Sequence, residues 1–182
     1  MTSGSAQAGL ALGKSAGDGV VYAKDLSRPM VFTVESALLD ELKKPADDFR
    51  VKDLFDARSF NTTRIEITRN GQTAAFEKEN GKDDWKQTAP AAKAADKAKV
   101  EALLTALGSA RATSFADGKT ATGLETPEVT IAVAFEDGQK HEKVAFARKG
   151  TDAFARRDGD ATAAKIDAAA LDGILKAIDA LK

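Results

Sequence analysis

Two long segments of the chain carry apolar residues at the spacing of an amphipathic α-helix. In Asp96–Leu107 the apolar positions fall at i, i+3, i+4 and i+7: Val100, Leu103, Leu104 and Leu107. This spacing puts these side chains on one helical face. Asp96 is suited to cap the start of the helix, and Gly108 is suited to end it. We therefore predict a helix with one buried face.

The C-terminal segment has the same design. Asp167 is its predicted N-cap, and its apolar stripe comprises Leu171, Ile174, Leu175, Ile178 and Leu181. A shorter helix is predicted over Ser36–Lys44, where Pro45 ends it. Its apolar residues are Leu38, Leu39 and Leu42.

Alternating apolar and polar residues predict strands between these helices. Arg64–Arg69 alternates strictly, and Asn70-Gly71 then predicts a tight hairpin into Thr73–Lys78. A third strand, Trp85–Thr88, follows an Asn80-Gly81 turn. Further strands are predicted over 129–135, 143–148, 153–157 and 161–166, with a turn at Asp137-Gly138. Several antiparallel strands thus precede each helix.

A repeated pattern relates the two ends of the chain. Residues 22–42 align with residues 154–174 without a gap, at a constant offset of 132 (154 minus 22). The offset pairs Tyr22 with Phe154, and it also pairs Val34 with Ile166 and Leu39 with Leu171. Because these positions are apolar, we interpret the repeat as a structural unit rather than a reactive centre.

The repeat divides the chain into modules. Residues 1–8 are interpreted as a vector-derived scar or a linker, and 9–58 as a first repeat that lacks the strand equivalent to 128–136. Residues 59–117 form a module containing Trp85, and 118–182 form a second, complete repeat. A cut inside a longer repeat would explain the missing strand, and we expect another segment or another chain to supply it.

Charge and cysteine content exclude several classes of site. Lys and Arg number 27 against 28 Asp and Glu, so the chain lacks the positive field that attracts nucleic acid or anionic membranes. Without cysteine there is no disulfide, thiol nucleophile or zinc–thiolate site. No apolar run reaches the roughly 18 residues of a membrane span. Residues 1–8 also lack the basic and apolar regions of an intact signal peptide.

Two short motifs resemble ligand-binding loops but depart from them. Ala8–Ser15 ends like a phosphate-binding loop, yet Ala8 replaces a required glycine and Leu10 and Leu12 alternate as in a strand. Asp158-Gly159-Asp160 offers oxygen ligands, but a calcium loop needs Gly and Glu where Ala163 and Ala169 stand. We therefore predict a strand and a solvated turn, and no metal or cofactor.

Acid–base candidates are equally sparse. His141 is the only histidine, and it lies in a charged stretch that is typical of an exposed loop. Asp47-Asp48 and Asp83-Asp84 could supply a carboxylate pair of the glycosidase kind, but turn-like, Lys-rich surroundings favour solvated charge. Asn61-Thr62-Thr63 fits a glycosylation sequon, although a turn or cap is the stronger interpretation.

Trp85 is the only tryptophan and the one possible ligand contact. An exposed Trp could stack on a sugar or a peptide. Its position at the start of a strand, ahead of an amphipathic helix, favours burial in the core.

Several features together carry a family resemblance. Ile65–Phe115 contains an IEITRNGQ hairpin, a WKQT strand and the helix sequence ADKAKVEALLTALGSARATSF. An Asp-Asp-Phe-Arg sequence ends at Arg50, and a Gly-Leu-x-x-Pro sequence begins at Gly123. With its flanks, 22–55 and 123–139, this segment resembles the family known as domain of unknown function 4340. The shared features are structural, so no catalytic residue is carried over.

The resemblance implies a cellular context. Members of the family are typically bacterial proteins that are tethered by an N-terminal membrane helix, project outside the cytoplasmic membrane and accompany gliding-motility-like ABC transporters. From the predicted strands, helices and repeat we expect an α+β fold, with antiparallel sheets packed by amphipathic helices in pseudo-repeated β-β-β-α modules. We expect a non-enzymatic accessory or scaffold domain that binds envelope proteins, possible transporter subunits among them. The alternatives are a carbohydrate or peptide module using Trp85 and, more remotely, a carboxylate-based hydrolase.

Overall fold

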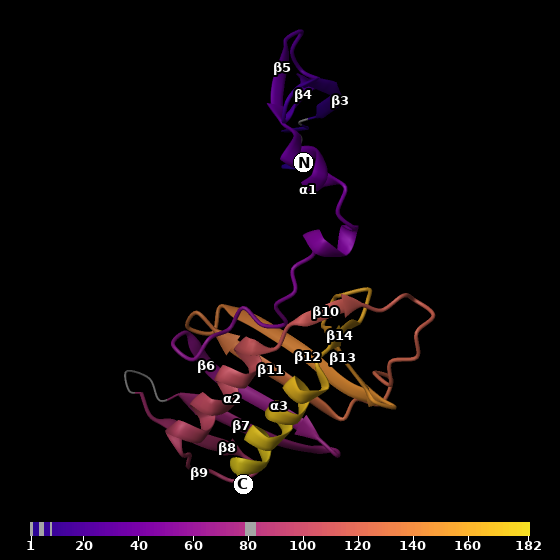
Figure 1. Ribbon diagram of the computed structural model, residues 1–182. Helices are drawn as coiled ribbons and strands as arrows, with labels where there is room; N and C mark the ends of the chain where they lie inside the picture. The colour runs from indigo at the N-terminus through magenta and orange to yellow at the C-terminus, as the bar shows by residue number, and fades with distance from the viewer. Residues whose placement is uncertain (1, 4–5, 8, 79–82) are drawn as a thin grey trace. The chain divides into compact units, whose positions relative to one another are not determined.

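The chain has a mixed α+β fold in which strands predominate. The computed structural model describes residues 2–3, 6–7, 9–78 and 83–182. These residues form two compact units, Met1–Arg50 and Val51–Lys182 (Figure 1). Among the described residues the strands pair only antiparallel, and three α-helices accompany them. The predicted α+β class is thus confirmed.

In the larger unit, residues 51–78 and 83–182 form one antiparallel sheet and two α-helices. In chain order its elements are β6 (Thr62–Arg69), β7 (Gln72–Lys78), β8 (Trp85–Ala89), β9 (Lys93–Ala94), α2 (Lys97–Ser109), β10 (Ala112–Phe115), β11 (Val129–Phe135), β12 (Lys140–Lys149), β13 (Asp152–Arg157), β14 (Ala164–Ile166) and α3 (Ala168–Ala180). The order across the sheet is β10-β14-β13-β12-β11-β6-β7-β8-β9. The β6–β11 pair therefore has β7, β8 and β9 on one side and β12, β13, β14 and β10 on the other.

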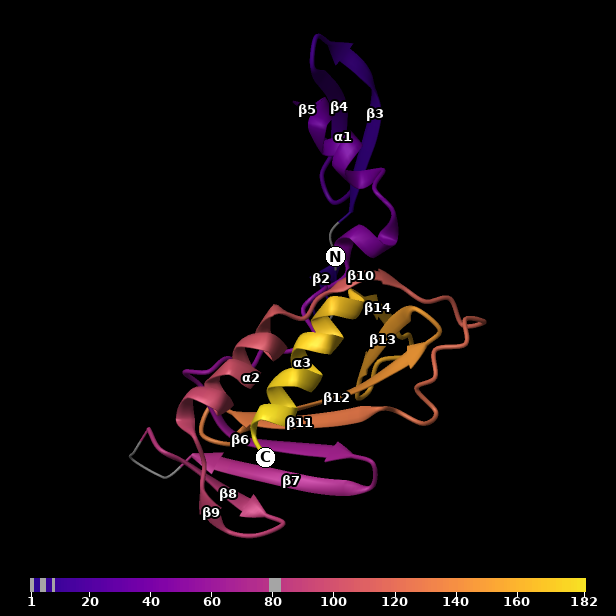
Figure 2. The same cartoon turned by 60° about the horizontal axis from the view of Figure 1, so that its bottom comes forward.

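Helices α2 and α3 pack side by side on one face of this sheet (Figures 1 and 2). The predicted stripes supply the buried side: Val100, Leu103, Leu104 and Leu107 of α2 and Leu171, Ile174, Leu175 and Ile178 of α3 are all buried. Asp96 and Asp167 accept hydrogen bonds from backbone N–H groups of the first turns, as predicted for N-caps. Gly108, the predicted end of α2, lies within the helix. The helix ends instead where Ala110 becomes extended and leads into β10.

Alternation along the strands divides the sheet into two faces. Ile65, Ile67, Ile131 and Val133 lie in the main core under the helices. A smaller cluster, made of Leu124, Ala147, Phe154 and Ala163, involves neighbours of core residues in β12 and β13. Because adjacent residues of a strand point to opposite faces, this cluster lies on the helix-free side.

The two predicted hairpin turns that lie in the described residues are confirmed. Asn70 and Gly71 have φ values of 53° and 73°, as required for the tight turn between β6 and β7. Asp137 and Gly138 also have positive φ in the turn between β11 and β12. The expected Asn80-Gly81 turn lies outside the described residues. Strands β9 and β10 are additional to the predicted ones, and β14 begins at Ala164 rather than Ala161.

The smaller unit contains far less core. Its elements are β1 (Thr2–Ser3), β2 (Ala6–Gln7), β3 (Leu10–Gly17), β4 (Val20–Asp25), β5 (Val31–Glu35), α1 (Ser36–Leu42) and a 3-10 helix (Ala46–Phe49). Strands β3, β4 and β5 form an antiparallel sheet in that order. Among the described apolar residues of this unit, only Val21 and Ala23 are buried. Helix α1 begins at Ser36 as predicted, but it ends at Leu42 rather than at Lys44 and has no buried residue.

Candidate functional site

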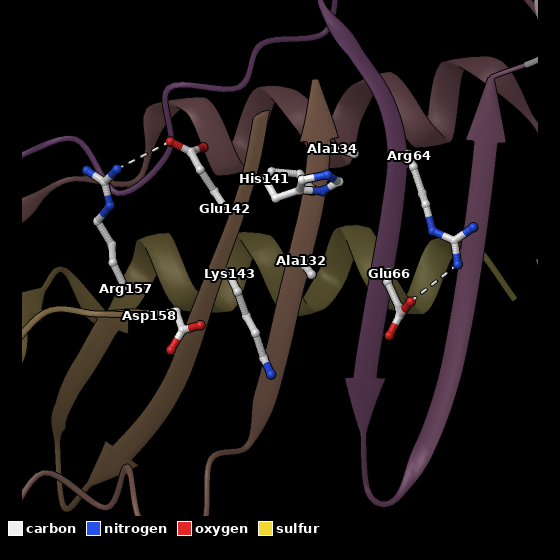
Figure 3. Close-up of a pocket in the computed structure, with 10 residues that line it drawn as sticks. Arg64, Glu66, Ala132, Ala134, His141, Glu142, Lys143, Arg157 and Asp158 are labelled. Atoms are coloured by element: carbon white, nitrogen blue, oxygen red, sulfur yellow. Dashed lines mark hydrogen bonds and ion pairs between the residues drawn. The ribbon is translucent and has the colours of Figure 1, made fainter. Parts of the chain in front are cut away.

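A shallow trough lies on the helix-free face of the larger sheet (Figure 3). Its floor is the central strand β11, which turns Ile131 and Val133 into the core and presents the small residues Ala132 and Ala134 on the other face. The trough has a volume of about 460 Å³. It exists because alanine leaves space between the longer side chains of the two flanking strands.

The strand register builds the trough in two cross-strand rows. Ala134 lies between Arg64 of β6 and His141 of β12. Ala132 lies between Glu66 of β6 and Lys143 of β12. Directly opposed residues in antiparallel strands are near neighbours. Each row thus consists of one small residue between two polar ones.

Charges around the trough are largely balanced. Arg64 forms ion pairs with Glu77 and, at 3.4 Å, with Glu66. Lys143 and Asp158 also line the trough. Both residues line a second, adjoining hollow of about 260 Å³ as well, together with Arg156 and Asp160. With both signs alternating, the surface has no concentrated potential for a highly charged ligand.

Glu142 lies at the rim of the trough, but its carboxylate is bonded to other residues of the chain. Its carboxylate accepts hydrogen bonds from the backbone N–H groups of Asp56 and Ala57 and forms an ion pair with Arg157 at 3.3 Å. Only 9% of the side chain is exposed. These contacts fix the loop before β6 against β12, so Glu142 shapes the trough without being available to a substrate.

His141 is exposed, as predicted, but it lies in strand β12 rather than in a loop. The strand begins at Lys140, directly after the turn. Among the described residues no carboxylate forms an ion pair with His141, so an orienting partner of the catalytic-triad kind is absent from its surroundings there.

Among the residues that the structure describes, four carboxyl groups have pKa values below their ordinary value. The hydrogen bond from Lys78 lowers the pKa of Asp83, and those from Lys182 and Arg69 lower the pKa of Asp179. The pKa values of Asp25 and Asp117 are lowered mainly by hydrogen bonds from Ser27 and Thr120. A general acid working near neutral pH needs a raised carboxyl pKa. None of these four groups has one.

The other residues that the sequence singled out as candidates lie in the core, in a strand or in turns. Trp85 is 3% exposed in the main core. Leu10–Gly17 is strand β3, and Asp158–Asp160 form an exposed turn in which Gly159 has a φ of 86°. Asn61 accepts a hydrogen bond from the Arg58 N–H, which confirms its role in a turn. Across the described ranges no group of His, Cys, Asp and Glu could hold a metal ion.

Sequence reasoning did not identify the trough. Its signal was the small alternate residues Thr130, Ala132 and Ala134 on one face of a predicted strand. That signal becomes a site only when β6 and β12 are known to flank β11.

A second exposed surface lies in the smaller unit. Strand β3 pairs with β4 along one edge, and no other described strand pairs with it. Leu10 is 45% exposed and Leu42 is 55% exposed, although both belong to apolar patterns. Other large apolar residues of this unit are also exposed: Tyr22, Leu26, Met30, Val31, Phe32, Leu38 and Phe49. An unpaired strand edge exposes a row of backbone N–H and C=O groups that can pair with another strand.

Comparison with known proteins identifies one relationship. A sequence model of the domain of unknown function (DUF4340) matches residues 1–127, which is more than half of the chain. No curated protein and no solved structure matches the chain.

Proposed function

The chain belongs to the family described as domain of unknown function (DUF4340), and on this premise we propose that it is a non-enzymatic accessory or scaffold domain. It binds other proteins of the bacterial cell envelope on the extracytoplasmic side. The observation that carries this proposal is the free edge of β3 beside exposed apolar residues in the smaller unit.

The energetics of the smaller unit support a partner. Ordering a residue costs about 1–2 kcal/mol of backbone entropy, which small domains must offset mainly by apolar burial. Val21 and Ala23 are the buried apolar residues among the described part of this unit. Their burial contributes only a few kcal/mol at about 25 cal/mol per Å². Burial of the exposed apolar side chains against another polypeptide supplies the stabilisation that the smaller unit lacks on its own.

The pseudo-repeat is also part of the proposal, and strand registers support it. In β4–β5, Val21 pairs with Val34, Tyr22 with Thr33 and Ala23 with Phe32. At the offset of 132 these become three observed pairs of β13–β14: Ala153 with Ile166, Phe154 with Lys165 and Ala155 with Ala164. We take β3-β4-β5-α1 as a repeat of β12-β13-β14-α3 that lacks the counterpart of β11.

The cellular context that the family resemblance implies supports the proposed location and partners. We place the chain in a parent protein that a membrane helix tethers, and we name ABC-transporter subunits as candidate partners. Among the described residues no helix is long and apolar enough to cross a membrane.

Labelling in cells tests the location. Because the chain has no cysteine, the single substitution Lys176→Cys on an exposed position of α3 creates a unique thiol in the chain. A membrane-impermeant maleimide should label this thiol in intact cells or spheroplasts. Labelling only after the cytoplasmic membrane is lysed would refute the extracytoplasmic assignment.

Photo-crosslinking tests the binding role. A photoreactive residue in place of Leu12, at the free edge of β3, should crosslink to envelope proteins in native membranes. The same residue in place of Lys176 is the matched control in the larger unit. An absence of any adduct specific to position 12 would refute protein binding through this surface.

A second candidate function is capture of an extended peptide in the trough. Its alanine floor and alternating charges favour a neutral polypeptide segment over a sugar or a nucleic acid. Ala132→Trp would fill the trough and abolish such binding, whereas Ala98→Trp, at an exposed position of α2 on the other face of the sheet, would not. Titration of the two variants with envelope extracts fractionated by size tests this candidate.

A further inference from the structure

The correspondence between β3 and β12 predicts what completes the smaller unit. Leu10 pairs with Asp25 and Leu12 with Ala23 in the β3–β4 ladder. At the offset of 132, Asp25 and Ala23 correspond to Arg157 and Ala155 of β13. In the larger unit these two residues pair with Val144 and Phe146. Through its partner strand, Leu10 therefore occupies the position of Val144, and Leu12 that of Phe146.

The two sets of residues differ sharply in burial. Val144 and Phe146 are 0% exposed. Leu10 is 45% exposed, and Leu12 is half-buried. The same holds in the helices, where Ile174 is 0% exposed and its counterpart Leu42 is 55% exposed. The smaller unit thus presents residues of core type without the elements that cover them.

The element that covers the corresponding edge in the larger unit is β11. Its residues Ile131 and Val129 lie directly opposite Val144 and Phe146. Three successive alternate β11 residues, Val129, Ile131 and Val133, have branched aliphatic side chains in the main core, and the aromatic Phe135 follows them at the end of the strand. The strand that completes β3 must therefore place a branched aliphatic residue opposite Leu10 and another opposite Leu12.

We propose that the free edge of β3 accepts, in antiparallel orientation, an extended donor strand from a partner polypeptide, with branched aliphatic residues opposite Leu10 and Leu12. This inference rests on the proposed function and names its surface and the partner's chemistry. Strand addition supplies backbone hydrogen bonds for affinity and side-chain pockets for register. A second copy of the chain cannot donate its own β11 without opening its sheet, because β11 is paired on both sides.

The edge itself suits such pairing. Strand β3 spans Leu10–Gly17, contains no proline and carries one charge, Lys14. Proteins that protect an edge from pairing place prolines or several charges on it. The register shift after Leu12 limits regular pairing to the first half of the strand, which is the half that carries both leucines.

The test uses the full chain and a synthetic peptide of residues 127–137, which contains the β11 sequence. A control peptide has Ser in place of Val129, Ile131 and Val133. We expect saturable binding of the first peptide by fluorescence anisotropy, and slower hydrogen exchange at the amides of β3 when it is bound. The control peptide should do neither.

Matched variants of the chain locate the binding. Leu10→Asp should weaken binding by about tenfold or more, because it removes an apolar side chain that the donor strand buries and places a charge in the contact. Tyr22→Ser is the control, since Tyr22 has a similar exposure of 49% on the same small sheet and its counterpart Phe154 lies in the cluster on the opposite face. It should leave affinity within about twofold. Circular dichroism of both variants establishes that the fold is retained.

Three outcomes would overturn the proposal: no saturable binding, binding that Leu10→Asp does not weaken, or protection of β3 that rises with protein concentration in the absence of peptide. The last outcome would show that a second copy covers the edge. The peptide assay contains no envelope protein. A negative result would therefore exclude the donor-strand mechanism only, and the crosslinking experiment would still test binding to envelope proteins independently.

Discussion

Glu142 accepts two hydrogen bonds from the backbone N–H of Asp56, at 3.0 and 3.1 Å, although the residues are 86 positions apart in the chain. The pair ties strand β12 to the loop that precedes β6. The loop carries Phe55, whose ring stacks on Phe146 with a centroid distance of 6.3 Å. One carboxylate therefore holds an irregular segment against the central core.

Glu142→Ala should destabilise the larger unit by about 1–3 kcal/mol, because the N–H groups of Asp56 and Ala57 lose their acceptor. Urea unfolding followed by circular dichroism measures the change. Glu125→Ala is the control, since Glu125 is exposed and its loss should change stability by less than about 0.5 kcal/mol. Equal effects of the two substitutions would contradict the role given to Glu142.

Gly123 should tolerate no side chain. Its φ is +74°, and a Cβ atom there would lie 2.9 Å from the carbonyl oxygen of Arg148. Gly123→Ala should therefore cost about 1–3 kcal/mol through backbone strain and steric conflict. This contact gives a physical reason for the glycine of the Gly-Leu-x-x-Pro sequence, whose Leu124 is buried beside Phe154.

Gly118→Ala provides the comparison for Gly123→Ala. Among the described residues, a Cβ atom added at Gly118 would meet open space, and the φ of this glycine is not positive. Its replacement should be neutral or slightly stabilising, since it reduces the entropy of the unfolded chain. Thermal unfolding of the two variants in the same buffer measures this difference in stability. Similar losses of stability at the two positions would refute the steric argument.

Trp85 should report on the core rather than on a ligand. At 3% exposure its ring is shielded, so native emission should be blue-shifted and poorly quenched by iodide. Trp85→Phe should preserve the fold with a loss of stability, and Trp85→Ala should cost about 3–5 kcal/mol. Strong quenching in the native state, or an emission change on adding oligosaccharides, would restore the alternative of a Trp85 binding surface.

Acid should weaken the contact between the β6 hairpin and the end of α3. Hydrogen bonds from Lys182 and Arg69 lower the pKa of Asp179 in the folded chain. A carboxyl whose folded pKa is below its unfolded value of about 3.9 contributes stability above that pH and loses it as pH falls further. Asp179→Asn should therefore reduce the dependence of stability on pH below about 4.

Salt provides the control for the Asp179 prediction. The group is exposed, so its interactions are screened at high ionic strength. The difference between Asp179→Asn and the parent chain should shrink in about 1 M NaCl, where the screening length is about 3 Å. A pH dependence that is unchanged by the substitution would exclude a contribution from this cluster.

Local patterns predicted the elements of the larger unit well. The alternation around Ile65 and Ile67 and the Asn70-Gly71 pair specify a hairpin through backbone sterics alone. Asp96 and Asp167 cap their helices because the cap depends only on neighbouring N–H groups. Gly108 misled the prediction of the end of α2, because a glycine ends a helix only when the chain turns through a positive φ there.

Long-range pairing was not predictable from local patterns. Strand β10 is short, and it exists because it pairs with β14, about fifty residues away along the chain. The trough likewise depends on β6 and β12 flanking β11. The stripe of α1 was recognised correctly, but its periodicity carried no information on whether anything packs against Leu38 and Leu42.

The position of β11 beside β6 also constrains the order of folding. Hairpins such as β6–β7 and β12–β13 join neighbours in sequence, whereas Ile67 meets Ile131 only after the chain between them has closed into a loop. Loop closure of this length slows folding. On the ribosome, β6 is made before β11, so the edge of β6 that pairs with β11 stays unpaired until residues beyond 135 emerge. During this interval the nascent chain is most open to pairing with the wrong strand.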